Sequence, residues 1–235
     1  MFSGFTYSQD DSNAWVKVAD DYRLNADNSR VSTQVTLFKN GKQTRQRLYT
    51  VYLKPGRKSL VLFESSGEKD QKVLMLADKF WLLMPASRRP IRITPMQKML
   101  GEASTGDIAT MSWHQDYDAD FKGSETIDGE LLDHLQLTAI TKGVSYQSIA
   151  LYLQPDTHKP VRAELYTSSG KLAKTATFVI EDRGDREMVT RMILSDAIQT
   201  NQVTEVDYLT SEAYELSDKY FNPQFLAKNR KLIIK

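Results

Sequence analysis

The chain of 235 residues contains no cysteine, and its charge is nearly balanced. Without cysteine, disulfide bonds, thiolate metal sites, iron–sulfur clusters and cysteine nucleophiles are all excluded. Lys and Arg number 31 and Asp and Glu number 30, which gives a net charge of +1. This balance argues against a protein dedicated to nucleic acids or anionic membranes, although it leaves a local charged patch open.

The sequence also lacks long hydrophobic segments. No apolar run approaches the roughly 20 residues that a membrane-spanning helix needs. The first residues, from Met1 to Phe5, lack the basic segment and apolar stretch of a signal peptide. Two readings fit these observations: a mature exported protein that begins with an added methionine, and a cytosolic protein.

Alternating hydrophobicity is the main pattern that is present. Val31, Thr33, Val35 and Leu37 alternate with polar residues, as expected for a half-buried strand, and Asn40-Gly41 predicts a hairpin turn after them. Further strands are predicted over residues 44–54, 58–64, 71–77, 79–84, 90–94, 131–141, 145–153, 160–167, 171–180, 187–195 and 202–209. Short antiparallel strands separated by polar turns indicate a mainly β protein, built as one large meander that is closed or half-closed.

The chain is predicted to form a single domain over residues 1–235, with strands at about 30–94 and 119–209. Three stretches of this domain depart from the strand pattern. Residues 13–22 are predicted to form an amphipathic helix with Trp15, Val18 and Ala19 on one side. Residues 95–105 are predicted to form a short lid helix, because Pro95 suits a first turn and Met96, Met99 and Leu100 then share one face. The segment 211–235 is predicted to be docked on the sheet and mostly irregular.

Motifs for catalysis or metal binding are missing. The three histidines, His114, His134 and His158, are far apart in the sequence, and no nucleophile elbow, P-loop or dinucleotide-binding motif occurs. The acidic run 116–120 resembles the start of a calcium loop, but Phe121 and Ile127 stand where that loop needs glycine and glutamate. We therefore expect no enzyme activity, no metal and no cofactor.

Residues 73–100 carry the strongest indication of a ligand. The strands predicted within 73–84 are apolar on both faces, and Arg88, Arg89 and Arg92 follow them, before the methionines of the lid. Methionine adapts to irregular apolar partners, and the arginine guanidinium suits phosphate or carboxylate groups. An amphiphile site is one interpretation; a well-packed sheet with a core helix and surface arginines is the other.

The amphiphile interpretation names a set of residues. Arg89 and Arg92 are the candidates for binding a headgroup at the rim. The apolar lining is predicted to consist of Val35, Leu37, Leu60, Leu62, Val73, Met75, Trp81, Leu83, Met96, Met99 and Leu100. Either face of residues 73–84 fits the lining equally well, because both faces are apolar.

The chain resembles a known family over roughly residues 15–225. The segments WLLMPASRRPIRI at 81–93 and MLGEASTGD at 99–107 are similar to the outer-membrane lipoprotein-sorting protein family, which is LolA-like. Weaker matches occur at 38–42, 58–63, 143–146, 160–164, 169–172 and 218–222.

The resemblance implies an incomplete antiparallel β-barrel, half-open, with short lid helices on an apolar concave face. It implies a periplasmic location and a non-enzymatic role in binding or carrying lipid or lipoprotein acyl chains. It also implies an inner-membrane transporter of the resistance–nodulation–division (RND) type as a partner. The alternative function within the same superfamily is an envelope-sensing or protein-interaction module like RseB.

Overall fold

The computed structural model describes residues 9–23, 28–109, 112–196, 201–229, 231, 232 and 234. Its helical elements are α1 (Gln9–Arg23), α2 (Thr105–Ile108), α3 (Trp113–Asp116), η1 (Asp218–Phe221) and α4 (Pro223–Lys228). Its strands are β1 (Ser29–Lys39), β2 (Lys42–Lys54), β3 (Lys58–Phe63), β4 (Lys72–Leu76), β5 (Lys79–Leu83), β6 (Ile91–Ile93), β7 (Lys98–Leu100), β8 (Ala103–Ser104), β9 (Tyr117–Ile127), β10 (Glu130–Ala139), β11 (Ser148–Leu153), β12 (Pro160–Tyr166), β13 (Leu172–Asp182), β14 (Glu187–Asp196) and β15 (Gln202–Ala213). Among the described residues, no helix combines the length and the apolar character that a bilayer crossing requires.

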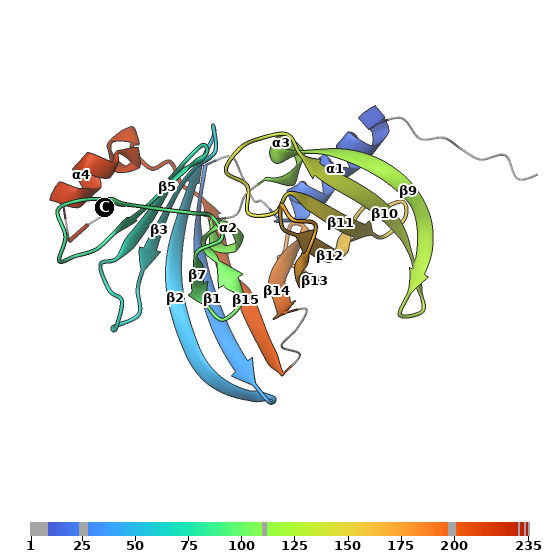
Figure 1. The fold of residues 1–235 in the computed structure, drawn as a ribbon, viewed down its shortest axis with the longest axis horizontal. Coiled ribbons are helices and arrows are strands. Elements are labelled where there is room, and N and C mark those ends of the chain that lie inside the picture. Colours follow the sequence, from blue (N-terminus) through green and yellow to red (C-terminus); the bar gives the residue numbers. More distant parts are fainter. Residues whose placement is uncertain are drawn as a thin grey trace, which may run out of the picture.

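Thirteen strands form one antiparallel sheet that does not close on itself. Its order is β6-β5-β4-β3-β2-β1-β15-β14-β13-β12-β11-β10-β9, and β7 pairs with β8 separately. The sheet thus consists of two meanders, β1–β6 and β9–β15, which join where β1 pairs with β15. The strands curve strongly, so the sheet encloses a concave side (Figure 1). The predicted fold class, a half-open antiparallel barrel, is confirmed.

The concave side holds the main hydrophobic core. Side chains from both meanders meet there, and α1, α2 and α3 contribute to the same cluster. Helix α1 agrees with the helix predicted over 13–22 but buries a different face. Val16 and Ala19 are completely buried, whereas Val18 is 37% exposed. Val18 was wrongly placed because Ser12, Val16, Ala19 and Asp20, spaced by four, seven and eight residues, form the face that packs inward.

The lid helix predicted over 95–105 does not form. Residues 98–104 instead make the β7–β8 hairpin, and only Thr105–Ile108 are helical. The reason lies at Gly101, whose φ of +55° closes the hairpin turn, a conformation that a helix interior does not contain. Glu102 N–H then donates a 2.9 Å hydrogen bond to Thr204 Oγ1 on β15. The apolar spacing of Met96, Met99 and Leu100 therefore reflects packing of an extended segment against the core.

The convex side carries a second core beneath the C-terminal segment. Tyr52, Leu60, Leu74 and Leu83 of β2–β5 form a buried cluster with Leu216, Phe221, Leu226 and Ala227. Asn222 caps α4, since its Oδ1 accepts hydrogen bonds from the N–H groups of Gln224 and Phe225. The segment 211–235 is predicted by the sequence to be mostly irregular, but β15 continues to Ala213, and the part that packs on the convex side includes the helix α4.

Candidate functional site

The concave side contains a cavity of about 360 Å³ near the seam between the two meanders. It is lined by Arg23, Val31, Leu53, Arg183, Asp185, Met188, Val189, Tyr208, Leu209, Thr210 and Ser211. Its wall therefore combines aliphatic side chains with polar ones and with three charged groups, those of Arg23, Arg183 and Asp185. Apolar side chains beside a few convergent charged groups are the composition of a site for an amphiphilic small molecule.

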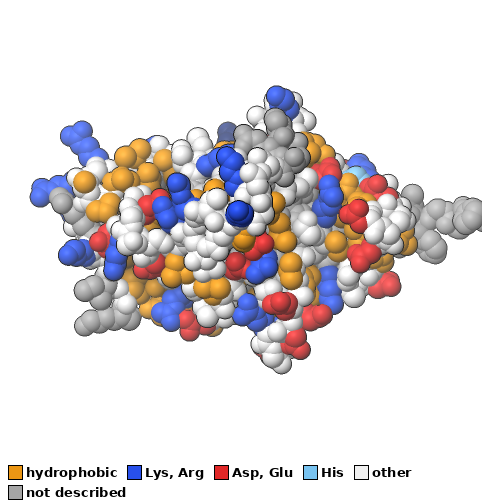
Figure 2. All heavy atoms as spheres, turned by 90° about the horizontal axis from the view of Figure 1, so that it is seen from below, with side chains coloured by type: hydrophobic (Ala, Val, Ile, Leu, Met, Phe, Trp, Pro, Cys, Tyr) orange, Lys and Arg blue, Asp and Glu red, His pale blue; other side chains and the backbone are white. Residues whose placement is uncertain are grey.

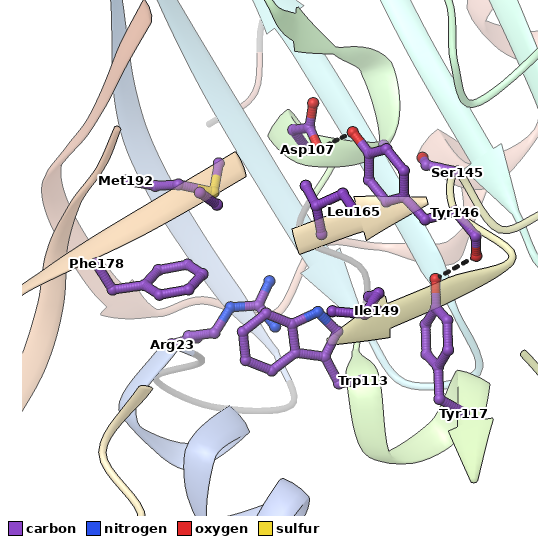
Figure 3. Close-up of a pocket in the computed structure, with 12 residues that line it drawn as sticks. Arg23, Asp107, Trp113, Tyr117, Ser145, Tyr146, Ile149, Leu165, Phe178 and Met192 are labelled. Atoms are coloured by element: carbon purple, nitrogen blue, oxygen red, sulfur yellow. Dashed lines mark hydrogen bonds between the residues drawn. The ribbon is translucent and has the colours of Figure 1, made fainter. Parts of the chain in front are cut away.

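A second, smaller cavity of about 40 Å³ is lined mostly by other residues of the same core. Its walls are mainly apolar and aromatic side chains of the second meander, together with Trp113 and Arg23 (Figure 3). A space of this size holds about one water molecule and no acyl chain. Among the residues that the structure describes, only Arg23 lines both cavities, so its side chain lies between them.

Arg23 is held in place by two contacts. Its guanidinium carbon lies 3.6 Å from the centroid of the Trp113 ring, a cation–π contact. Its Nη1 donates a 2.8 Å hydrogen bond to Asp20 Oδ1, one turn earlier on α1. Figure 3 shows the guanidinium lying against the indole beside Phe178 and Met192. Because the cation sits at the helix C-terminal turn, the helix dipole also favours its position.

Asp20 organises the region around Arg23. This carboxylate is 1% exposed, and its Oδ2 accepts 2.9 Å hydrogen bonds from Ser112 Oγ and His114 N. His114 Nδ1 also lies 2.9 Å from Oδ2. The hydrogen bond to Asp20 raises the pKa of His114, against the opposing effect of burial. The network ties α1 to α3 and thereby positions Trp113 against Arg23.

A buried polar cluster lies on the other side of the small cavity. Asp107 Oδ2 accepts hydrogen bonds from Ser104 N at 2.8 Å, from Ser104 Oγ at 2.7 Å and from Lys174 Nζ at 2.9 Å. Tyr146 OH donates to Asp107 Oδ1 at 2.9 Å (Figure 3), and Lys174 Nζ also donates to the Glu102 carbonyl. Burial opposes ionisation of Asp107, but Lys174 and Ser104 outweigh it and lower its pKa. The cluster is a satisfied ion pair that anchors α2 to β13.

The predicted lining residues are divided between the two faces of the sheet. Seven of them belong to or pack against the concave core: Val35, Leu37, Val73, Met75, Met96, Met99 and Leu100. The other four belong to the convex cluster under the C-terminal segment: Leu60, Leu62, Trp81 and Leu83. The register explains the division, because Leu60, Leu74 and Trp81 are cross-strand neighbours and share one face. The eleven residues therefore do not line one cavity.

The predicted headgroup residues are also outside the curve of the sheet. Arg92 stacks over Trp81 at 4.6 Å, on the convex side, and both Arg89 and Arg92 are exposed. Neither arginine lines the large or the small cavity. The cations that do line the large cavity are Arg23 and Arg183.

Asp116, His134 and His158, which were considered for catalysis or metal binding, form ion pairs, hydrogen bonds or ring stacks with neighbouring side chains. Asp116, the first residue of the acidic run, is 1% exposed. Its Oδ1 lies 2.7 Å from Arg57 Nε and accepts a 2.8 Å hydrogen bond from Thr141 Oγ1. His158 stacks on Trp15, and His134 stacks on Tyr152. Within the described ranges, no three His, Asp or Glu side chains gather as a metal site would need.

Comparison with known proteins identifies the family. A family model with the description "Uncharacterized protein" matches residues 55–228, and no curated protein matches the chain. A LolA superfamily protein from Nitrosomonas europaea has 29% identity and a TM-score of 0.82, over 90% of this chain and 97% of its own. The chain belongs to the family of that model, and it is similar in sequence and fold to a LolA superfamily protein.

Two further structures share the LolA fold at lower identity. One is a DUF1329 family protein from Desulfovibrio piger, with 21% identity and a TM-score of 0.75, over 94% of this chain and all of its own. The other is a domain from Vibrio parahaemolyticus named for outer membrane lipoprotein sorting. It has 20% identity and a TM-score of 0.72, with the same coverage.

Sequence reasoning missed the residues that bound the cavities of this LolA-like core. Arg23 and Trp113 are 90 positions apart, and no local period links them. One local signal exists: Asp20 lies on the predicted helix, and Arg23, three residues later, directly follows its predicted end, so the two opposite charges are placed to pair if the helix continues by one residue. The cavity residues Val31 and Leu53 lie on predicted strands, but the concave position of those strands follows only from the sheet order.

Proposed function

We propose that this chain is a periplasmic, non-enzymatic carrier that binds acyl chains of lipids or lipoproteins on its concave side. The observation that carries the proposal is the 360 Å³ cavity, in which apolar side chains and the guanidinium groups of Arg23 and Arg183 share one wall. Its volume lies within the range typical of small-molecule sites, about 300–1,000 Å³. The aliphatic side chains of the wall suit hydrocarbon. The two arginines outnumber the one carboxylate, Asp185, and suit a carboxylate or phosphate at the end of the hydrocarbon.

The hydrophobic effect supplies the driving force. Each methylene removed from water contributes about 0.8 kcal/mol, so eight methylenes favour binding by roughly 6 kcal/mol before ordering costs. A longer chain requires more space than the cavity provides. We infer that it extends along the concave core toward the seven concave members of the predicted lining, of which Leu37, Met96 and Met99 are only partly buried.

Binding of a fluorescent fatty acid to protein stripped of lipid tests the proposal. Leu209→Glu places a charge in the wall of the large cavity at a side chain that is already 41% exposed, so the variant should fold. Met99→Glu places one in the proposed extension. Both should weaken binding at least tenfold. Leu131→Glu, at a side chain 58% exposed on β10, is the matched control and should bind as the unmodified protein does.

The outcomes separate the possibilities. Unchanged affinity in Leu209→Glu contradicts binding in the large cavity, and unchanged affinity in Met99→Glu contradicts the extension alone. No measurable binding by the unmodified protein contradicts the carrier function and favours the protein-interaction alternative.

We also infer an inner-membrane RND transporter as the partner that supplies or receives the ligand, as the family resemblance implies. Crosslinking in intact cells, followed by purification from solubilised envelopes, tests this inference. Recovery of such a transporter with the chain supports it. Recovery of the chain without one contradicts it.

A further inference from the structure

The near-zero net charge of the chain conceals two oppositely charged ends. Residues 79–101 contain five Lys and Arg and no acidic residue, and residues 216–235 contain five Lys and Arg and one acidic residue, Asp218. The rest of the chain then carries 21 basic and 29 acidic side chains. Charge is therefore distributed by segment rather than mixed along the chain.

The fold brings most of the basic positions of these two segments to one end of the molecule. Helix α4 packs against β5, and β5 pairs with the edge strand β6. The basic end is defined here by exposed cations from β6 and the loop before it and from the C-terminal segment: Arg88, Arg89, Arg92, Lys219, Lys228 and Lys231. Figure 2 shows blue side chains gathered at the end where Figure 1 places α4 and β5.

The opposite edge of the sheet is acidic. Residues 116–134, which contain β9 and the first half of β10, include seven Asp and Glu and one lysine, Lys122. Strands β6 and β9 are the two ends of the sheet order. Charged side chains on an edge strand discourage unwanted strand pairing, but either sign achieves this. Edge protection alone therefore does not account for opposite signs at the two edges.

The basic end has two properties beyond its charge. In the part of the chain that the structure describes, no carboxylate forms an ion pair with Arg88, Arg89 or Arg92. Ile91 lies between these arginines on the edge strand and is 47% exposed. Arg92 also covers Trp81, and amphipathic aromatic rings are favoured at the boundary between headgroups and hydrocarbon. Free cations around an exposed apolar side chain complement a surface of anionic phospholipid.

We propose that the basic end docks this protein on membrane surfaces rich in anionic phospholipid. The phosphate groups contact the arginines and lysines, and Ile91 enters the headgroup layer. The acidic edge at β9 is repelled by the same surface, so the molecule approaches with β6 and α4 first. The proposal goes beyond acyl-chain binding, because it concerns the outer surface and requires no occupant in the cavity.

Vesicle flotation with lipid-stripped protein tests the docking. Vesicles in which about a third of the lipid is phosphatidylglycerol should bind the protein, and vesicles of phosphatidylcholine alone should not. Raising the salt to about 0.5 M should release the protein, because the Debye length falls to about 4 Å and the attraction between the basic end and the anionic surface is screened. Equal binding to both kinds of vesicle, or binding that resists salt, overturns the proposal.

Two charge variants locate the surface. Arg88→Gln/Arg89→Gln/Arg92→Gln should weaken vesicle binding on the order of a hundredfold, since each basic residue near such a surface contributes roughly fivefold. Lys42→Gln/Arg45→Gln/Lys171→Gln removes three exposed cations elsewhere and gives the same net charge. It should bind nearly as tightly as the unmodified protein. Equal loss in both variants shows an effect of net charge and overturns the docking surface.

The same experiments separate docking from the carrier function. The arginine variant should still bind the fluorescent fatty acid, and Leu209→Glu should still float with anionic vesicles. Absence of flotation together with normal fatty-acid binding overturns only the docking. If the basic end binds an acidic peptide but no vesicle, its partner is an acidic protein and the proposal is wrong.

Discussion

The guanidinium of Arg23 lies 3.6 Å from the ring of Trp113, at the position where the large and the small cavity approach each other. The pair closes the inner part of the concave core. A hydrogen bond to Asp20 fixes the Arg23 side chain, and Trp113 is fixed as the first residue of the helix α3. Several contacts therefore keep the two side chains together.

Removal of the Arg23 side chain should join the two cavities. Arg23→Ala and Arg183→Ala each remove one guanidinium from the wall of the large cavity, but only Arg23→Ala also adds space. We therefore expect Arg23→Ala to bind the fluorescent fatty acid about fourfold more tightly than Arg183→Ala does, the gain for one further buried methylene. We also expect Arg23→Ala to lose about 1–3 kcal/mol of stability, because Asp20 loses one of its donors. Arg183→Ala is the control, since Arg183 lines only the large cavity and donates to the carbonyls of Tyr208 and Leu209. Equal affinities in the two variants contradict the role of Arg23 as a barrier.

The buried ion pair of Asp107 and Lys174 gives a second prediction. Lys174→Met leaves Asp107 buried without its cation, and such losses cost about 3–5 kcal/mol. Lys171→Met, at an exposed position on the hairpin before β13, should change stability by less than about 0.5 kcal/mol. Urea unfolding measures both free energies. A cost below 1 kcal/mol for Lys174→Met, or equal costs in both variants, would show that Asp107 does not depend on Lys174.

The same pair predicts the sign of a pH effect. The pKa of Asp107 is lowered in the folded protein, so its contribution to stability is present above the unfolded value and is lost as the pH falls through the folded value. In Lys174→Met the carboxyl is buried without compensation and binds a proton more readily. The destabilisation measured for this variant should therefore shrink as the pH falls toward about 4, and a constant difference would contradict the assignment.

His114 predicts a change of stability at higher pH. Its pKa is raised above 6.5 by Asp20, so the stabilisation is fully present below the unfolded pKa and is lost as the pH rises through the folded one. We expect the urea midpoint to fall between about pH 5.5 and about pH 8.5, and to fall less in His114→Gln. Identical pH profiles for the two proteins would assign the effect to another group.

Gly101 gives a prediction with an internal control. An alanine there has an unfavourable φ of +55°, and its Cβ meets Thr204 Oγ1 and, at 2.8 Å, Leu37 Cδ1. Gly41→Ala has a similar φ of +72° but meets nothing within 4 Å. We expect about 1 kcal/mol of destabilisation for Gly41→Ala and about 1–3 kcal/mol more for Gly101→Ala. Equal losses of stability would mean that the β7–β8 hairpin adjusts without cost.

The sequence predicted the strands well because most of them bury one face. Val31 and Val35 alternate with polar neighbours, and both are buried in the concave core. Residues 73–84 gave no such guidance, since their two faces are covered by different partners, the concave core and the C-terminal segment. The cover on the convex side comes from residues more than 130 positions later, which a local pattern does not reveal.

The candidate site was less predictable than the fold, for two physical reasons. The spacing of Met96, Met99 and Leu100 fits both a helix and an extended segment, and the turn at Gly101 decides between them. The cavity boundary depends on Arg23 and Trp113, which only the packing of α1 against α3 brings together. The alternation of residue types shows which face of a strand is apolar. A cavity, in contrast, is the space that the side chains on that face leave empty.

The pairing of β1 with β15 has a consequence for the order in which the protein folds. Strands β2 to β6 follow β1 closely, but the register between β1 and β15 joins Val35 to Val206. During synthesis the first meander therefore emerges with one edge of β1 unpaired. That edge gains its hydrogen-bond partners only when β15, the last strand, has been made. An exposed edge that includes Val31 and Val35 is open to pairing with other chains during this interval. Completion of the sheet at the β1–β15 seam is thus the expected slow step, and the point at which a holding chaperone would be most useful.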